Sequence, residues 1–260
     1  MIGFIYAIVI FIATFLGASA GLGGGVIIKP VLDFISLHDL TTISFLSTTA
    51  VFTMAVYSTI KQIRNKVKFD YLMIVLIAIG AVIGGNIGSS MFSSLLKLYD
   101  ANMIKMIQAA SLAVLLVGVL INTNMNFKTF HIKNPVLTLI IGFLLGVISS
   151  FLGIGGGPIN VAVFTLFFSI DMKSATIYSI ATILFSQGSK LFSIFTSTGF
   201  MVFDLSLLWF TLPAALLGGI VGTYVNRLAN EKTITKIFSS TVLVIILLNI
   251  YNGVQAFLGR

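Results

Sequence analysis

The chain has no cysteine and very little charge. The missing cysteine excludes disulfides, thiolate metal sites and cysteine nucleophiles. Only 8% of the 260 residues are charged, against roughly 25% in an ordinary soluble domain, whereas 58% are hydrophobic and the mean hydropathy is +1.12. So few charges cannot cover so much apolar surface in water, which argues against a soluble enzyme, a nucleic-acid binder and a disordered chain. The composition therefore predicts a membrane protein.

Acidic residues are also scarce. Seven Asp and Glu stand against fifteen Lys and Arg, which gives a net charge of +8. The basic residues lie mostly between apolar stretches, as in cytoplasmic loops that face anionic lipid. The acidic residues all fall near the ends of apolar segments, which argues against a buried carboxylate relay or a carboxylate-lined cation site. His38 and His131 are far apart, and we expect neither a metal site nor a cofactor.

Six apolar segments are long enough to cross a bilayer, which needs roughly 20 apolar residues per helix. They lie near residues 43–60, 70–92, 103–122, 174–196, 205–226 and 236–257. Residues 1–37 are too long for one crossing, since a helix of ~37 residues measures ~55 Å, and residues 135–170 raise the same problem. Glycine clusters at 21–25 and 153–157 interrupt these two regions, which predicts a broken helix or a helical hairpin at each. Residues 1–20 lack the basic start of a signal peptide, so we expect them to be retained as a span.

The chain is predicted to be a duplication. The two glycine clusters lie 132 residues apart, and further matching pairs follow at offsets of 131 to 134. These pairs are Phe69-Asp70 with Phe203-Asp204, Gly84–Gly88 with Gly218–Gly222, and Lys105 with Lys236. Several pairs in register indicate an internal repeat, with residues 1–130 as one transmembrane half and 131–260 as the other.

Loop charge favours inverted over parallel repeats. If residues 1–37 cross once, the halves are parallel and the two sides carry seven and four basic residues. If residues 1–37 cross twice, or enter and return, each half has an odd number of crossings and the halves are inverted. One side then carries only Lys97 and Arg260, and the other carries nine: Lys61, Arg64, Lys66, Lys68, Lys128, Lys133, Lys173, Arg227 and Lys232. This distribution obeys the positive-inside rule better. We therefore expect an all-α polytopic membrane protein with inverted repeats of about five segments each.

The paired glycine breaks point to a substrate site. Irregular backbone survives at membrane depth only inside protein or along a polar cavity, and broken segments at matching positions of two halves are typical of transporter binding sites. The helices that begin at each break would direct partly positive N–H groups at an anion, and Pro158 suits a first helical position. The alternative is close helix packing or a simple kink. The candidates from the breaks are Gly21, Gly23, Gly24, Gly25, Gly153, Gly155, Gly156, Gly157, Pro158 and Asn160.

Polar residues inside the spans supply further candidates. Lys29 and Lys190 lie within apolar stretches, where a charge is a functional candidate by default; the alternatives are snorkelling, or an i, i+4 pair of Lys29 with Asp33. Ser179, Thr182, Ser186 and Lys190 share one helical face. Short hydroxyls can donate to an oxyanion, although bonds along or across helices are their commoner use. The candidates from the spans are Lys29, Ser47, Thr48, Thr49, Ser186, Gln187 and Lys190.

The paired G-[LI]-G-G-G-x-[IV] type clusters resemble those of the TauE/SafE family of sulfite exporters. The Phe-Asp pairs and the glycines spaced by four residues that follow them, Gly80, Gly84 and Gly88 in one half and Gly218 and Gly222 in the other, fit the same pattern. Such spacing is typical of close helix packing. Pro158 follows the second cluster directly, whereas Pro30 stands five residues beyond the first, so the two half-sites differ. The resemblance covers the whole chain and implies transport of sulfur-containing anions or organic acids.

We therefore predict a secondary transporter of the cytoplasmic membrane that moves a small anion, such as a sulfur oxyanion, organosulfonate or organic acid, by alternating access. An anion-selective channel is the main alternative. A lipid-directed enzyme lacks a clustered acid, base or nucleophile, and a scaffold role leaves the paired breaks unexplained. No ATP-binding motif is present, so we expect a proton or sodium gradient, or a partner ATPase, to drive the transport, with uniport as the alternative. Substrate, direction and oligomeric state stay open.

Overall fold

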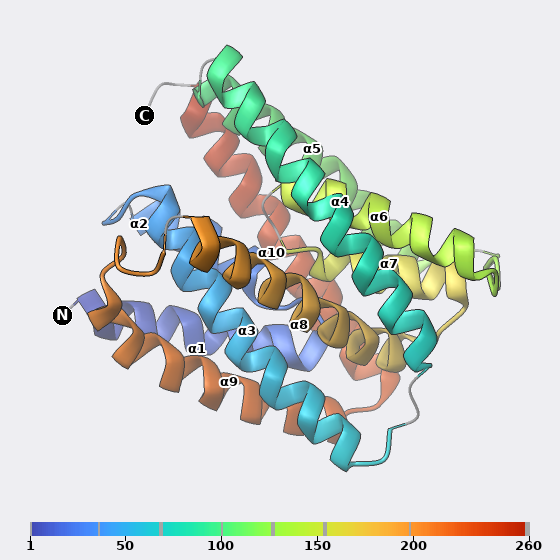
Figure 1. Cartoon of the computed structure of the whole chain (residues 1–260). Helices are drawn as coiled ribbons and strands as arrows, with labels where there is room; N and C mark the ends of the chain where they lie inside the picture. The colour runs from blue at the N-terminus through green and yellow to red at the C-terminus, as the bar shows by residue number, and fades with distance from the viewer. Residues whose placement is uncertain are drawn as a thin grey trace.

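The computed structural model describes residues 2–35, 37–67, 70–99, 101–125, 128–152, 155–197 and 199–257, and these are all-helical. In chain order the helices are α1 (Ile2–Ala20), α2 (Gly25–Ile35), α3 (Leu40–Arg64), α4 (Tyr71–Leu98), α5 (Ala101–Asn124), α6 (Pro135–Leu152), α7 (Gly157–Phe168), α8 (Met172–Ser197), the 3₁₀ turn η1 (Leu205–Leu207), α9 (Leu208–Leu228) and α10 (Glu231–Phe257). Seven of them are long and apolar enough to cross a membrane. The prediction of an all-α polytopic membrane protein is confirmed (Figure 1).

Each glycine cluster forms the tip of a helical hairpin, as the sequence predicted. In the first hairpin, α1 and α2, the Tyr6 hydroxyl lies 2.7 Å from Nδ1 of His38, so the start of α1 and the end of α2 are side by side. In the second hairpin, α6 and α7, the N–H groups of Phe130 and Ile132 donate to carbonyls at the end of α7, each at 2.9 Å. Figure 1 shows the first hairpin entering the bundle from the left and the second from the right, so their tips meet near the centre.

The order long, short, long, long, long occurs twice along the chain. The first helix of each five packs along the fourth helix of the other: α1 against α9, and α6 against α4. Glycines permit this close approach, because a Cβ at Gly84 would overlap the carbonyl of Phe143 and a Cβ at Gly218 would overlap α1 at Phe11 and Thr14. The predicted packing role of the glycines spaced by four residues is confirmed.

Aspartates begin the helices, which explains why acidic residues fall at segment ends. Asp39 and Asp70 accept from backbone N–H groups in the first turns of α3 and α4. Asp171 accepts from the N–H of Ser174 in α8, and Asp204 from that of Ser206 before α9. These carboxylates satisfy helix N–H groups that lack a partner within the helix.

α8 is enclosed by other helices over its first half. It is not among the seven span candidates, although the sequence placed an apolar segment at 174–196. Its residues from Ala175 to Ile183 are all buried. α8 packs against α3, α4 and α7, so the hydroxyls of its buried first half face other protein segments. Its second half is more open, with Phe185, Phe192 and Phe195 exposed.

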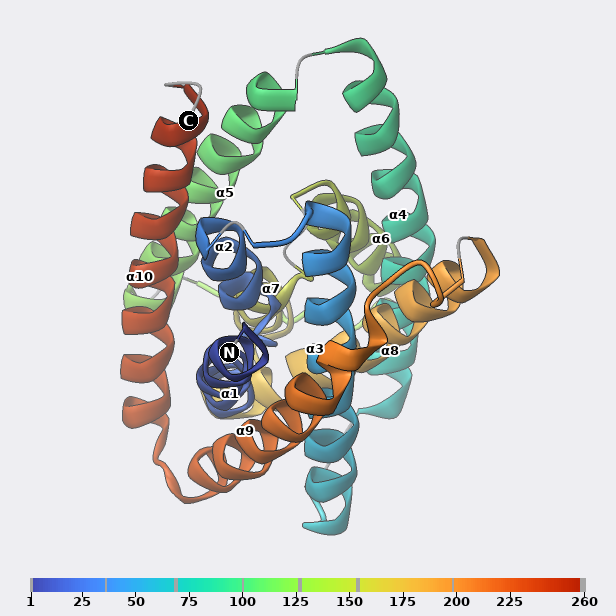
Figure 2. The same ribbon diagram turned by 90° about the vertical axis from the view of Figure 1, so that its left-hand side faces the viewer.

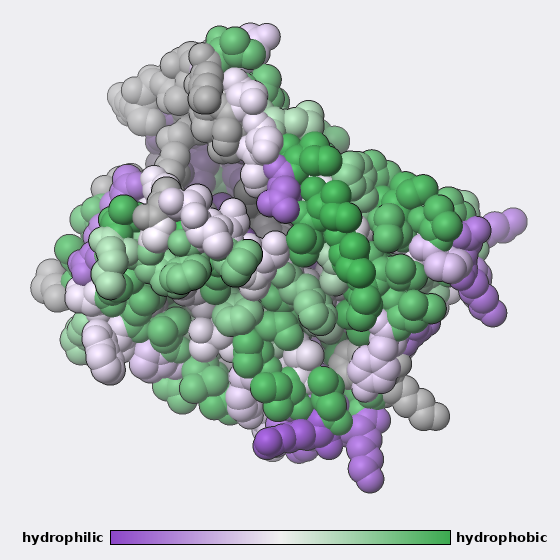
Figure 3. Space-filling view, in the orientation of Figure 1, coloured by the Kyte–Doolittle hydropathy of each residue, from purple (hydrophilic) through white to green (hydrophobic). Residues whose placement is uncertain are grey.

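The two ends of the bundle differ in charge. The end that holds the N-terminus of α1 and the C-terminus of α10 is called the terminal face, and the opposite end the basic face. Purple residues gather along the right and lower edges of Figure 3, at the basic face, with green residues between the ends. The described basic residues at or near helix ends of that face are Lys61, Arg64, Lys66, Lys128, Lys133, Lys173, Arg227 and Lys232.

Candidate functional site

The backbone of both tips is left-handed where the glycines lie. Positive φ angles occur at Gly21, Gly23 and Gly24 in the first tip, and at Gly155 and Gly156 in the second. Side chains with a Cβ rarely adopt this conformation. Gly153 lies outside the described residues. Gly25 and Gly157 are the first residues of α2 and α7.

The two tips touch each other and α8. A Cβ at Gly157 would overlap the carbonyl of Leu22, so the second tip rests directly on the first. The Ser179 hydroxyl of α8 lies 2.7 Å from the carbonyl oxygen of Gly21 and 3.3 Å from that of Gly157, and its side chain is fully buried. Ser179 therefore ties both hairpin tips to one central helix.

Two buried amides surround the second tip. Nε2 of Gln187 lies 3.0 Å from where a Cβ of Gly155 would stand, and the Asn160 amide comes equally close to Gly156. Both side chains are at least nine-tenths buried, at 8% and 4% exposure. Neither side-chain amide makes a hydrogen bond within the described ranges. Pro158, buried in the first turn of α7, has no N–H to satisfy.

Helix termini add further donors at the same place. The first N–H groups of α2 and α7 have no carbonyl partner within their helices, and both helices begin at the crossing of the tips. The partly positive end of a helix favours a negative charge. The crossing thus gathers backbone N–H groups, the amides of Asn160 and Gln187, and no carboxylate among the described residues.

Two lysines lie beside the tips. Lys29 is on α2, one turn beyond the glycines, and Lys190 is on α8, one turn beyond Gln187. They are close enough for their charges to repel each other, and Asp33 lies within electrostatic range of Lys29. Nζ of Lys190 donates to the hydroxyl of Ser44 at 2.9 Å.

The hydroxyls predicted on α3 are less available. Thr48 donates to the carbonyl of Ser44, and Thr49 to those of Phe45 and Leu46, all within α3. Ser186 donates to the carbonyl of Ile183 in α8. Ser47 is buried at 3% exposure and occupies the position in its half that Ser179 has in the other. The structure thus brings Gln187, Lys190, Lys29 and Asn160 to the tips and leaves Thr48, Thr49 and Ser186 bonded within their helices.

The sequence did not identify three structural contacts. Ser179 was placed on the polar face of its helix, but its bonds to both tips could not be foreseen from spacing alone. Asn226 is fully buried and donates to the Ser19 carbonyl and the Thr176 hydroxyl next to the first tip. His38 and His131 each close the base of a hairpin, His131 by contact with Ser169 at 2.8 Å. No group of three or more His, Asp or Glu residues in the described ranges could hold a metal ion.

Comparison with known proteins gives one family. The model of the "Sulfite exporter TauE/SafE" family matches residues 6–249. The chain is 26% identical over 271 residues to "Probable membrane transporter protein YunE" of Bacillus subtilis (strain 168), a match that covers 94% of this chain and 95% of that protein. A shorter match, 33% identical over 98 residues, is to "Sulfite exporter TauE/SafE family protein 5" of Arabidopsis thaliana and covers 37% of this chain and 21% of the plant protein. No solved structure matches the chain.

Proposed function

The chain belongs to the TauE/SafE family of membrane transporters, and we propose that it is a secondary transporter that moves a small anion across the cytoplasmic membrane by alternating access. The proposed substrate is a sulfur-containing oxyanion, an organosulfonate or a short organic acid. Support for the sulfur chemistry comes from the family description and from the plant relative, which is named a sulfite exporter.

The observation that carries the proposal is the pair of lysines at the crossing of the tips. Lys29 and Lys190 place two half-buried amino groups inside a membrane protein, with Asp33 within electrostatic range of Lys29 and the Ser44 hydroxyl accepting from Lys190. The charged form of an amino group is costly to bury unless a negative charge lies nearby. An anion would balance the two charges, accept from Gln187 and Asn160, and lie at two helix N-termini.

We propose that residues 1–130 and 131–260 are inverted repeats, with the basic face in the cytoplasm. Two returning hairpins, each followed by three spans, give every half an odd number of crossings. The eight described basic residues of the basic face agree with the positive-inside rule. Reporter tags in loops 61–68 and 197–204 should appear on opposite sides of the membrane; tags on the same side would disprove the inversion.

Alternating access would act where the tips cross. The hairpins enter from opposite ends and share the Ser179 contact, so a rocking motion of one hairpin would open the site to one face and close it to the other. A channel is the second candidate, because the same backbone could line a pore. The driving ion, a proton or sodium, has no candidate carboxylate at the crossing, and backbone carbonyls are the oxygens available there.

Anion binding can be tested by thermal unfolding of the purified protein in detergent. The probes are sulfite, sulfate, thiosulfate, taurine and acetate at equal ionic strength. A ligand at ~100 times its dissociation constant adds ~2.7 kcal/mol of stability. We expect one class of anion to raise the unfolding temperature of the wild type and to lose this effect in Lys29→Met and Lys190→Met.

Lys128→Met and Lys232→Met are the controls, since these lysines lie at the basic face, away from the tips. A flat response of a cooperatively unfolding wild type to every anion would overturn the proposal. Flux in proteoliposomes then separates the two mechanisms: a transporter gives saturable uptake that unlabelled anion inside accelerates, whereas a channel gives electrical currents without counterflow.

A further inference from the structure

One face of α4 changes character halfway along its length. Leu72, Val75, Ile79 and Ile83 follow one another on this face toward the basic end, and each is exposed. The same face continues toward the terminal face with Asn86, Ser90 and Ser94, which are also exposed. At 1.5 Å per residue, these three polar residues extend over about 12 Å of helix, starting near the middle of α4.

The second half of the chain provides a comparison within the same molecule. At the offset that aligns Gly84 with Gly218, the polar positions correspond to Ile220, Tyr224 and Leu228 of α9. Tyr224 and Leu228 are 56% and 63% exposed, so this stretch of α9 carries the large side chains expected against lipid. Hydrocarbon offers no hydrogen bonds to an exposed amide or hydroxyl. The Ser90 hydroxyl donates to the Asn86 carbonyl of its own helix, whereas the exposed Asn86 side chain would face hydrocarbon if lipid covered this part of α4.

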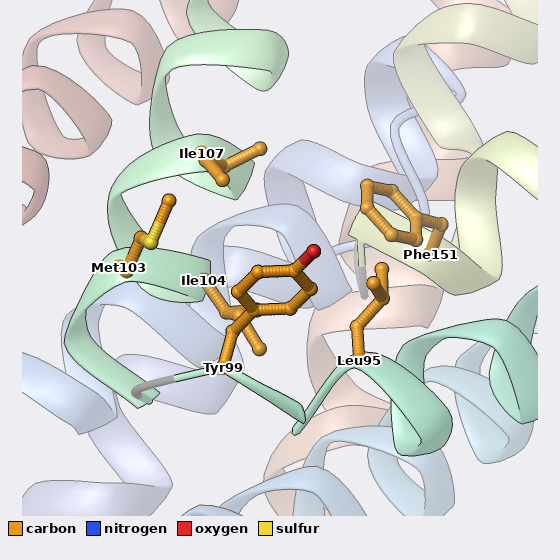
Figure 4. Close-up of a pocket in the computed structure, with 6 residues that line it drawn as sticks. All are labelled: Leu95, Tyr99, Met103, Ile104, Ile107 and Phe151. Atoms are coloured by element: carbon orange, nitrogen blue, oxygen red, sulfur yellow. The ribbon is translucent and has the colours of Figure 1, made fainter. Parts of the chain in front are cut away.

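Two adjoining hollows lie along this part of α4. One is an open groove with about 540 Å³ of space, lined by α4 alone at Asn86, Ile87, Ser90, Met91, Ser94 and Leu95. The other, of about 300 Å³, is lined by Leu95, Tyr99, Met103, Ile104, Ile107 and Phe151. Leu95 lines both. Figure 4 shows the Tyr99 ring between Ile104 and Leu95, with its hydroxyl directed to the side where Phe151 lies.

The smaller cavity reaches the end of α6. Phe151 is in the last turn of α6, just before the tip. Next to Asn86 in the chain, Gly85 lies against α6, where its Cβ would stand 3.0 Å from the Ser150 hydroxyl. Figure 2 shows α4 and α5 close together at the top, where they are connected, and spreading apart below it, with α6 and α7 between them. Figure 3 shows a recess below the C-terminal part of α4, with pale and purple residues on its wall.

We propose that the recess between α4 and α5 is an aqueous vestibule through which a hydrated small anion reaches the second tip from the terminal face. The identity of the solute rests on the proposed function, whereas the water in the vestibule does not. The polar half of the α4 face would be wet, the apolar half would face lipid, and the second tip would close the inner end. The structure would then be the state open to the terminal face.

The absence of cysteine makes the vestibule directly testable. Single cysteines are introduced as Ser90→Cys and Ser94→Cys, with Val75→Cys and Ile79→Cys as controls on the same face and Tyr224→Cys as the control at the repeat-related position of α9. The probe is a membrane-impermeant anionic methanethiosulfonate, applied separately to vesicles of each orientation. Only a thiolate reacts, and a thiol ionises in water but not in hydrocarbon.

We expect Ser90→Cys and Ser94→Cys to react at least tenfold faster than the three control variants, and only when the reagent reaches the terminal face. Equal, slow reaction at all five positions would overturn the vestibule in favour of lipid. Oxidative cross-linking of Ser90→Cys into dimers, with no labelling, would overturn it in favour of contact with a second copy.

This outcome is separable from that of the proposed function. Fast labelling with no thermal response to any anion would keep the vestibule and reject the anion. Slow labelling with a clear anion response that depends on Lys190 would keep the anion site and reject this route to it.

Discussion

The two hairpin tips share a sequence pattern but lie in different surroundings. Around the first tip, Gly21 and Gly24 face the backbone of Thr176 and Ala13, and Gly23 faces the aliphatic end of Ile183. Around the second, Gly155 and Gly156 face the side chains of Gln187, Asn160 and Ser149. The first tip is packed against backbone and hydrocarbon, whereas the second is lined by groups that can donate hydrogen bonds.

This difference separates two uses of glycine that sequence alone cannot distinguish. One use is to let segments of backbone touch, and the other is to leave room for a ligand beside polar side chains. The repeat therefore does not produce two equal half-sites. In the proposed site, the first hairpin would contribute its lysine, and the second would contribute the amides that select the solute.

The largest effect is expected where the tips touch. Gly157→Ala would drive a methyl group into the Leu22 carbonyl, with backbone on both sides of the contact. Overpacking of this kind costs ~1–3 kcal/mol or more, and neither tip can move without disturbing Ser179. We expect no monodisperse folded protein in size-exclusion chromatography.

Two other alanine substitutions complete this experiment. Gly155→Ala meets only the flexible end of Gln187, so it should fold with a loss of ~1–2 kcal/mol from its left-handed backbone. Gly118→Ala on α5 has open space around it and should gain up to ~1 kcal/mol from helix propensity. Normal folding of Gly157→Ala would mean that the tips are not pressed together.

The features of this fold that the sequence predicted follow from short sequence patterns. A glycine cluster inside an apolar segment too long for one crossing forces a break, and the pairs at offsets of 131 to 134 predicted an internal repeat. Glycines four residues apart predicted close helix contacts, and the structure has them at Gly84 and Gly218. These features depend on residues that are neighbours along one helix.

The contacts that the sequence did not predict depend on which helices pack against each other. Nothing in the spacing of α8 says that Ser179 meets both tips, or that Gln187 rather than Ser186 faces Gly155. The threonines of α3 had suitable chemistry but bond to their own helix, because a carbonyl one turn back is always within reach. Tertiary contacts of this kind cannot be derived from periodicity.

The second prediction concerns the amide that distinguishes the second tip. Gln187→Leu removes a donor to the proposed anion while keeping the volume similar. A hydrogen bond to a charged group contributes ~1.5–3 kcal/mol, so sulfite affinity should fall ~10–100-fold in a titration followed by thermal shift. The protein should unfold no more easily without ligand, because the amide has no partner in the described chain to lose.

Gln62→Leu is the matched control. Gln62 is as buried as Gln187, at 3% exposure, but it lies near the basic end of α3. Its replacement should leave sulfite affinity unchanged. Equal losses in both variants would show that any buried glutamine matters for the fold, and the second tip would lose its special role.

The third prediction compares two serines at equivalent repeat positions. Ser179→Ala leaves the Gly21 and Gly157 carbonyls without their donor, and unsatisfied buried groups cost ~1–3 kcal/mol. Ser47→Ala should cost less, because the described structure gives Ser47 no hydrogen bond to lose. Thermal unfolding without ligand measures both, and similar losses would indicate that the tips are held symmetrically.

The smallest effect concerns the caps of the helices that follow the hairpins, α3 and α8. Asp39 accepts from the N–H groups of Thr41 and Thr42 and from the Thr42 hydroxyl, whereas Asp171 accepts from the N–H of Ser174. Replacing an N-cap by alanine costs ~1 kcal/mol, and we expect Asp39→Ala to cost more than Asp171→Ala.

The hydrogen bonds from Thr41 and Thr42 lower the pKa of Asp39 to about 2, below its usual value of about 3.9. A pKa lowered by folding stabilises the protein above that usual value, and the contribution fades as the pH falls toward 2. The difference in unfolding temperature between wild type and Asp39→Ala should therefore be constant from pH 7 to 5 and shrink below pH 4. A difference that grows on acidification would mean that the protonated carboxyl, and not the carboxylate, stabilises the start of α3.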